Sequence, residues 1–134
     1  IQAGRRKTAY FACNPRALAD KLKLSGFMAA SDIFGLNFSK DDVFLNRGSI
    51  EECLQNFSKC MHKYDSVMCA NDISAIALIH FAASKGVKIP EDLYVTGFGN
   101  IILGQILTPS LTSATLNYYD AGCHAVDSSI YLKF

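Results

Sequence analysis

Long apolar segments are missing from this sequence. No stretch approaches the roughly 20 apolar residues needed to cross a bilayer. The first residues also lack the basic start and apolar core of a secretion signal. We therefore expect no membrane contact and a cytoplasmic location. The chain begins at Ile1 and not at a methionine, so we expect it to be a piece of a longer protein.

A strong charge of one sign is missing as well. The formal net charge is +1, and the longest basic run is Arg5-Arg6-Lys7. A nucleic-acid-binding module carries a basic stripe and a motif that directs it to the groove. Since neither is present, we expect this chain not to bind DNA by itself.

The sequence also lacks paired cysteines of the CxxC type. Its five cysteines are an odd number scattered through apolar segments, which favours buried thiols in a reducing compartment over disulfides. Cys53, Cys60 and His62 are predicted to share one helix, but structural zinc sites use CxxC-like pairs. We expect no metal and no cofactor.

Catalytic motifs are not found. The glycines of the GFG segment at residues 97–99 resemble part of a dinucleotide loop, but the position of the third glycine is Ile102. The histidines His62, His80 and His124 have no nucleophile or carboxylate at a motif spacing. We therefore expect no enzymatic activity.

What the sequence does contain is an alternation of strands and helices. Of the 134 residues, 50% are apolar and 19% charged, which suits one domain with a substantial core. Helices are predicted after each of the first three strands and at residues 118–131. The predicted strands are residues 8–12, 43–45, 66–70, 93–98 and 111–116. This pattern predicts a three-layer α/β fold with a mostly parallel sheet flanked by helices.

Helix starts carry capping residues. Asn14 followed by Pro15 is typical of a first helical turn. Ser49 and Glu52 have the spacing of a capping box, and apolar residues at helical spacing continue to Met61. The segment at residues 100–107 is apolar but is predicted to be irregular.

Polar or small residues follow the predicted strands. In parallel α/β sheets, ligands bind outside the carboxyl ends of the strands. Asn14, Arg47, Asn71 and Gly99 all fall at those ends. The pattern therefore predicts a site assembled from separate loops at this edge.

Several motifs together resemble the lactose/galactose repressor (LacI/GalR) family. They are YDSVMCANDISAIAL at residues 64–78, VKIPEDLYVTGFGN at 87–100 and LTPSLTSATL at 107–116. The opening GRRKTAYFACNP with KLKLSGF at 21–27 resembles the start of the second subdomain of the effector-binding region. The match covers nearly the whole chain, and the combination of motifs is specific.

The resemblance implies a type I periplasmic-binding-protein-like fold. Residues 1–116 would form its C-terminal subdomain, and residues 117–134 would begin the return into the N-terminal subdomain. The implied function is effector sensing in a transcriptional regulator, with a sugar or sugar derivative in the cleft between subdomains. DNA would be bound only through a helix-turn-helix head outside this chain. The alternative is the solute-binding protein of a sugar ABC transporter.

The resemblance also implies ligand-binding residues. Asn71 would face the effector, leaving Asp72 to cap the following helix. Lys23 stands where the family has a pocket arginine. Gly99, followed by Asn100, stands where the family has an acidic residue.

These departures, with Leu116 in place of a glutamine, argue against a plain sugar. Arg16 and Arg47 near the same edge suit an anionic ligand such as a phosphorylated sugar. They could equally be solvated surface arginines.

An apolar surface points to self-association. A monomer rarely exposes a contiguous aliphatic patch, and the family resemblance implies a two-fold homodimer through this region. The alternative is that the loop folds back onto its own sheet. The interface is predicted to include Ile73, Ala77, Ile101, Ile102, Leu103, Ile106 and Leu107.

Overall fold

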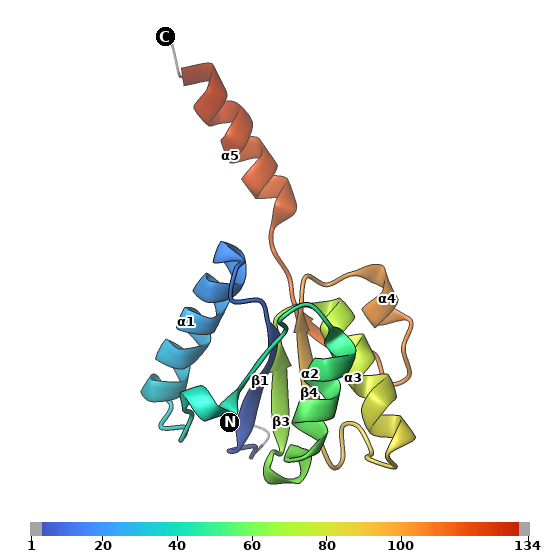
Figure 1. Cartoon of the computed structure of the whole chain (residues 1–134). Coiled ribbons are helices and arrows are strands. Elements are labelled where there is room, and N and C mark those ends of the chain that lie inside the picture. The colour runs from blue at the N-terminus through green and yellow to red at the C-terminus, as the bar shows by residue number, and fades with distance from the viewer. Residues whose placement is uncertain (1–3, 132–134) are drawn as a thin grey trace.

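The computed structural model describes residues 4–131, with side-chain exposures for residues 4–126. Its strands all run parallel in one sheet of order β2-β1-β3-β4-β5. The strands are β1 (Thr8–Cys13), β2 (Val43–Leu45), β3 (Ser66–Cys69), β4 (Tyr94–Phe98) and β5 (Thr112–Ala114). The predicted parallel sheet is confirmed (Figure 1).

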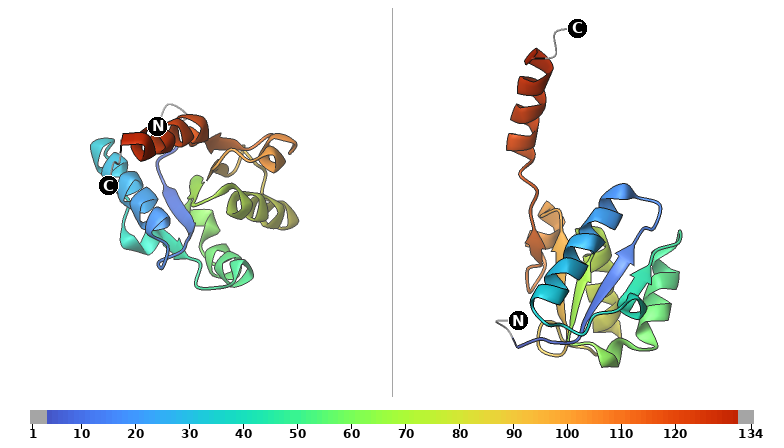
Figure 2. Two further views of the ribbon diagram at one scale, coloured as in Figure 1. Left: turned by 90° about the horizontal axis from the view of Figure 1, so that it is seen from above. Right: turned by 90° about the vertical axis from the view of Figure 1, so that its left-hand side faces the viewer.

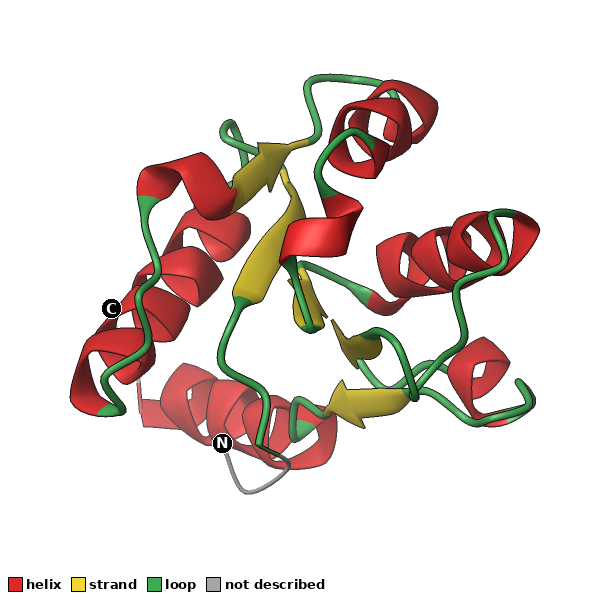
Figure 3. Cartoon of the chain, turned by 90° about the horizontal axis from the view of Figure 1, so that it is seen from below, coloured by secondary structure: helices red, strands yellow, loops and turns green. Residues whose placement is uncertain are grey.

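Helices cover both faces of the sheet. Figure 2 (left) shows α1 (blue) on one face and α2 (green) and α3 (yellow-green) on the other, and Figure 3 shows helices on both sides of the strands. The α-helices are α1 (Leu18–Ile33), α2 (Ile50–Ser58), α3 (Asp72–Ser84), α4 (Ile102–Gln105) and α5 (Tyr118–Tyr131). Short 3-10 turns lie at Lys40–Asp42 and Met61–Lys63. The three-layer α/β architecture is therefore confirmed.

Strand β1, which lies between β2 and β3, contributes side chains to two core layers, because successive side chains of a strand point to opposite faces. Phe11 packs with Phe57 of α2 in the larger cluster, with ring centroids 5.6 Å apart. Tyr10 packs with Phe27 of α1 in the smaller one, at 5.3 Å. Burial on both faces explains why residues 9–13 of β1 are continuously apolar and buried.

The last helix, α5, extends beyond the carboxyl edge of the sheet, away from the other helices (Figures 1 and 2). The subdomain boundary predicted between residues 116 and 117 falls in the linker that leads to it and stays a prediction. Among the described residues, no helix is long and apolar enough to cross a membrane.

Two helix-start predictions are corrected. The first helix begins at Leu18 and not at Pro15, because Asn14 accepts the N–H of Arg16 in a separate turn at 2.9 Å. Ser49 does cap α2 by accepting the N–H of Glu52 at 3.2 Å. Its hydroxyl donates to the Glu51 carboxylate. The Glu52 side chain does not accept the Ser49 N–H, so the expected reciprocal bond of the capping box is not formed.

Two further predictions about helix extent are wrong. Helix α2 ends at Ser58, so Cys60, Met61 and His62 lie outside it, and Cys53 and His62 do not share a helix. The segment predicted to be irregular contains the short helix α4. Its start is held by a tertiary hydrogen bond from the Ile101 N–H to Asp72, which no local pattern reveals.

Candidate functional site

The loops after β1 and β2 enclose a pocket of about 300 Å³ at the carboxyl edge of the sheet. A register shift between Phe11 and Cys13 turns the chain at this point, and Ala12 there has a φ of 61°. The pocket is lined by Asn14, Pro15, Arg16, Asn46, Arg47 and Gly48. The structure thus brings together Arg16 and Arg47, which the sequence places 31 residues apart.

Both asparagines in this pocket shape their own loops. Asn14 Oδ1 accepts the N–H of Arg16 at 2.9 Å, and Asn46 Oδ1 accepts the N–H of Gly48 at 3.1 Å. Such side-chain-to-backbone turns fix the path of a short loop. Asn46 was missed by the sequence reasoning, although asparagine two residues before glycine is a recognisable turn pattern.

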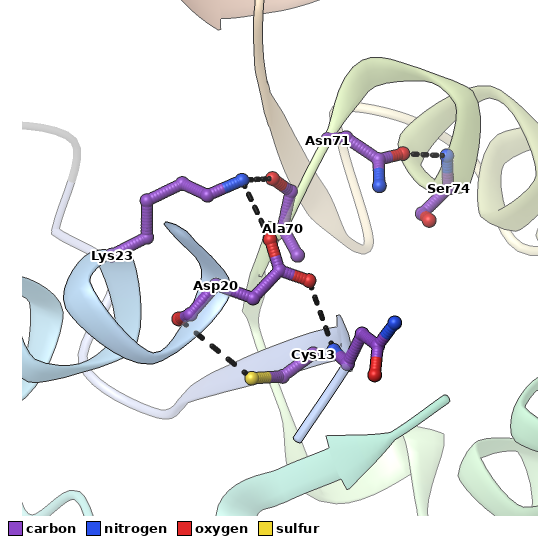
Figure 4. A network of polar contacts seen from close by, with 7 residues as sticks. Cys13, Asp20, Lys23, Ala70, Asn71 and Ser74 are labelled. Carbon is purple, nitrogen blue, oxygen red and sulfur yellow. Dashed lines mark hydrogen bonds and ion pairs between the residues drawn. The ribbon is translucent and has the colours of Figure 1, made fainter. Parts of the chain in front are cut away.

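Lys23 joins α1 to the end of β3. Its Nζ donates to the Ala70 carbonyl at 2.6 Å and pairs with Asp20 Oδ1 at 2.8 Å (Figure 4). It also lies 4.9 Å from the centroid of the Phe98 ring. Asp20 Oδ2 accepts the N–H of Asn14 at 2.9 Å. Lys23 therefore lies at the predicted edge, and its charge is balanced by Asp20.

The capping roles of Asn71 and Asp72 are the reverse of those predicted. Asn71 is the N-cap of α3, and its Oδ1 accepts the N–H of Ser74 at 2.8 Å (Figure 4). Its side chain is still exposed at the carboxyl edge, so capping leaves its Nδ2 available to a ligand.

Asp72 is buried and holds neighbouring segments together. Its carboxylate accepts the Ile101 N–H at 2.8 Å and the Ser113 hydroxyl at 2.6 Å. It thereby links α3 to α4 and β5. The sequence reasoning missed this role, because both partners lie far away in the chain.

Gly99 and Asn100 lie at the end of β4. Gly99 has a φ of +126°, a conformation that strains any side chain, so an acidic residue does not suit this backbone. Its N–H donates to Ala114, and the N–H of Asn100 donates to Ser113. Leu116, beyond β5, is 47% exposed.

The six predicted ligand-binding residues are spread along the whole edge. Arg16 and Arg47 belong to the loops after β1 and β2, whereas Gly99 and Asn100 follow β4. With parallel strands roughly 4.8 Å apart, the ends of β2 and β4 are separated by about 14 Å. Lys23 and Asn71 lie between them, near the end of β3.

Two buried thiols, Cys13 and Cys53, lie beneath this edge. Burial raises the pKa of Cys13, with a further increase from Asp20, and raises the pKa of Cys53 to about 11. Such thiols remain protonated and unreactive at neutral pH. Within residues 4–126, no group of three or more His, Cys, Asp or Glu side chains is placed to hold a metal ion.

A separate apolar surface lies on α3 and α4. Ile73, Ile102, Leu103 and Ile106 are 50% to 74% exposed, so α4 does not fold back to bury them. Ala77, Ile101 and Leu107 are half-buried at its margin. We call the four exposed residues the α3/α4 patch.

The fold and this edge define an α/β lobe of the periplasmic-binding-protein type. The chain belongs to the periplasmic binding protein-like domain family, whose model matches residues 2–130.

Its relatives are transcriptional regulators. The NTD biosynthesis operon regulator NtdR of Bacillus subtilis is 28% identical over 129 residues, covering 94% of this chain and 39% of NtdR. Catabolite control protein A of Staphylococcus epidermidis is 41% identical over 70 residues, covering 52% of this chain and 21% of that protein. A LacI-family regulator from Rhizobium etli has a TM-score of 0.78 at 26% identity, covering 99% of this chain and 52% of its own.

The resemblance to the LacI/GalR effector-binding region is thereby confirmed. The chain spans about two fifths of the length of NtdR.

Proposed function

We propose that this chain is the effector-sensing lobe of a LacI-type transcriptional regulator and has no catalytic role. It binds a small molecule, a sugar or sugar derivative, in a cleft between its carboxyl edge and a partner subdomain. The observation that supports this is the pocket of Arg16 and Arg47 beside Lys23 and Asn71, built from separate loops at the edge where parallel sheets bind ligands.

Residues 1–116 act as the C-terminal subdomain in this proposal, and residues 117–134 lead back into the N-terminal one. The extended position of α5 beyond the carboxyl edge suits such a crossing (Figure 1). Specific DNA binding is assigned to a helix-turn-helix head outside residues 1–134. The relatives support a regulator over a transporter-linked binding protein.

Self-association is the second part of the proposal. The α3/α4 patch pairs with the same patch of a second copy, in a two-fold dimer that includes Ile101, Leu107 and Ala77 at its margin. The 74% and 72% exposures of Ile102 and Ile106 support this part, since aliphatic side chains gathered on one surface favour a partner.

The test is a thermal-shift screen of sugars, sugar phosphates and purines on the full-length protein that contains this chain. A stabilising compound that also changes operator binding is the expected result. A compound that is chemically transformed by the protein would contradict the proposal. So would a screen in which no compound stabilises it.

Asn71→Ala and Lys23→Ala test the site itself. Each loss of a buried polar contact is expected to weaken effector binding about tenfold to a hundredfold. Unchanged affinity in both folded variants would remove these residues from the site.

A further inference from the structure

The polar side chains around the Arg16 and Arg47 pocket offer donors and almost no acceptors. Asn14 Oδ1 and Asn46 Oδ1 already accept backbone N–H groups of their own loops. Because those backbone groups can only donate, the amide orientation is fixed, and each Nδ2 is left as the free end. Among the residues whose side chains are described, no carboxylate lines the pocket.

The two guanidinium groups have no partner among the side chains that the structure describes. Within residues 4–126, neither Arg16 nor Arg47 makes a side-chain hydrogen bond or ion pair. Both side chains line the same pocket and carry the same charge. Like charges held near one another favour an anion between them, since an anion relieves their repulsion.

Asn71, the next polar side chain along the edge, also presents a free donor. Asn71 Oδ1 accepts the N–H of Ser74, which leaves its Nδ2 as the free donor. The Lys23 ammonium is balanced by Asp20. The uncompensated positive charge therefore comes from the two arginines.

A neutral sugar fits a pocket surrounded mainly by hydrogen-bond donors poorly. Each sugar hydroxyl carries a proton that needs an acceptor, and acidic or amide oxygens normally supply it. Here each amide oxygen of Asn14, Asn46 and Asn71 already accepts one backbone N–H and keeps at most one further lone pair, and Gly99 provides no side chain. An oxyanion accepts hydrogen bonds and needs no acceptor in return.

The geometry points to an effector that carries a phosphate or carboxylate group, held between Arg16 and Arg47 with the Nδ2 groups of Asn14 and Asn46 beside it. This inference rests on the proposed sensing function and specifies the chemistry of its ligand. Phosphate and carboxylate share the required oxygens, so the experiment has to separate them.

The experiment uses the full-length protein and matched probes, namely glucose, glucose 6-phosphate, glucuronate and inorganic phosphate. Each is measured by thermal shift and by calorimetric titration. Stabilisation by the charged probes, with glucose at least tenfold weaker, is the expected result. A preference for glucose 6-phosphate over glucuronate identifies phosphate as the group, and the reverse order identifies carboxylate.

Variants locate the anion. Arg16→Ala and Arg47→Ala are each expected to weaken charged-probe binding about tenfold or more. Asn46→Asp keeps the oxygen that accepts the Gly48 N–H but replaces the free donor with a negative charge. This variant is expected to weaken charged-probe binding to a similar extent. Arg6→Ala, which removes the same charge at the opposite edge of the sheet, is the matched control. Its affinity for the charged probes should stay within about twofold of the wild-type value.

The outcomes separate this inference from the proposed function. Equal binding of glucose and glucose 6-phosphate, or full affinity in both arginine variants, overturns the anion site and leaves a sensor of neutral ligands. If neither these probes nor the wider screen stabilises the protein, both the anion site and the sensing function are overturned.

Discussion

The hydroxyl of Ser113 in β5 donates to the Asp72 carboxylate of α3 at 2.6 Å. The same carboxylate accepts the N–H of Ile101, at the start of α4. Asp72 directly follows Asn71 of the candidate site, and α4 with its C-cap Ile106 carries three of the four residues of the α3/α4 patch. One buried side chain thus connects the edge proposed to bind the effector with the surface proposed to pair two copies.

Gly97 of β4 is the position most tightly constrained by this carboxylate. A Cβ at Gly97 would overlap Asp72 Oδ1 and would lie 3.0 Å from Leu111 Cδ2. We expect Gly97→Ala to lower the free energy of unfolding by about 1–3 kcal/mol, measured by urea denaturation. Gly26→Ala is the control, since Gly26 lies in α1 with nothing near its Cβ, and it should stabilise by about 0.5–1 kcal/mol. A urea denaturation midpoint that is unchanged in Gly97→Ala would contradict the close approach of Gly97 to the Asp72 carboxylate.

The hydroxyl of Tyr10 is buried without a hydrogen-bond partner among the described residues. Burial, with contributions from Cys13 and Asp20, raises its pKa, so it stays a neutral phenol at all ordinary pH values. An unsatisfied buried hydroxyl costs free energy. We therefore expect Tyr10→Phe to leave stability unchanged or raise it by about 1 kcal/mol in chemical denaturation.

Tyr64→Phe is the matched control for Tyr10. The Tyr64 hydroxyl donates to Asp42 Oδ1 at 2.9 Å, so its removal should cost about 1 kcal/mol. Loss of stability in Tyr10→Phe equal to that in Tyr64→Phe would show that Tyr10 has a partner after all.

Asp65 makes stability depend on pH. Burial raises its pKa, but the N–H groups of Arg6 and Lys7, at 2.9 Å and 3.1 Å, outweigh this and hold the pKa below its ordinary value of 3.8. A carboxyl whose pKa is lower in the folded state stabilises above its unfolded pKa, and this contribution is lost as the pH falls through the folded pKa.

Asp65→Asn is therefore expected to be less stable than the wild type at pH 7 by at most about 1 kcal/mol. The difference should shrink steadily below pH 3.8. Urea denaturation of both proteins at neutral and acid pH measures it. A difference that is the same at both pH values would show that the charge of Asp65 plays no part.

The sheet could be predicted from the sequence because its determinants are local. A short apolar strand followed by a helical pattern recurs three times, and parallel order follows from that alternation. The gathering of Arg16 and Arg47 follows as well, since both come directly after neighbouring parallel strands.

Features set by distant contacts could not be predicted in this way. Asn71 and Asp72 are both good capping residues, and the choice between them depends on Ile101 and Ser113, which lie 29 and 41 residues away from Asp72. The short helix α4 has no side-chain cap of its own and starts at the N–H that Asp72 holds.

The α3/α4 patch gives the sharpest test of self-association. Ile102 and Ile106 are one helical turn apart, 74% and 72% exposed, and Ile102→Asp with Ile106→Asp would place two charges in the centre of the proposed interface. Burying unpaired charges in such an interface is strongly unfavourable. We therefore expect this double variant to sediment as a folded monomer, while the wild type sediments as a dimer.

Leu18→Asp with Leu22→Asp is the matched control, since these α1 residues are 70% and 64% exposed on another surface, and it should remain dimeric. A wild-type protein that is monomeric at high micromolar concentration would contradict the assignment, as would a dimer that survives the α4 substitutions.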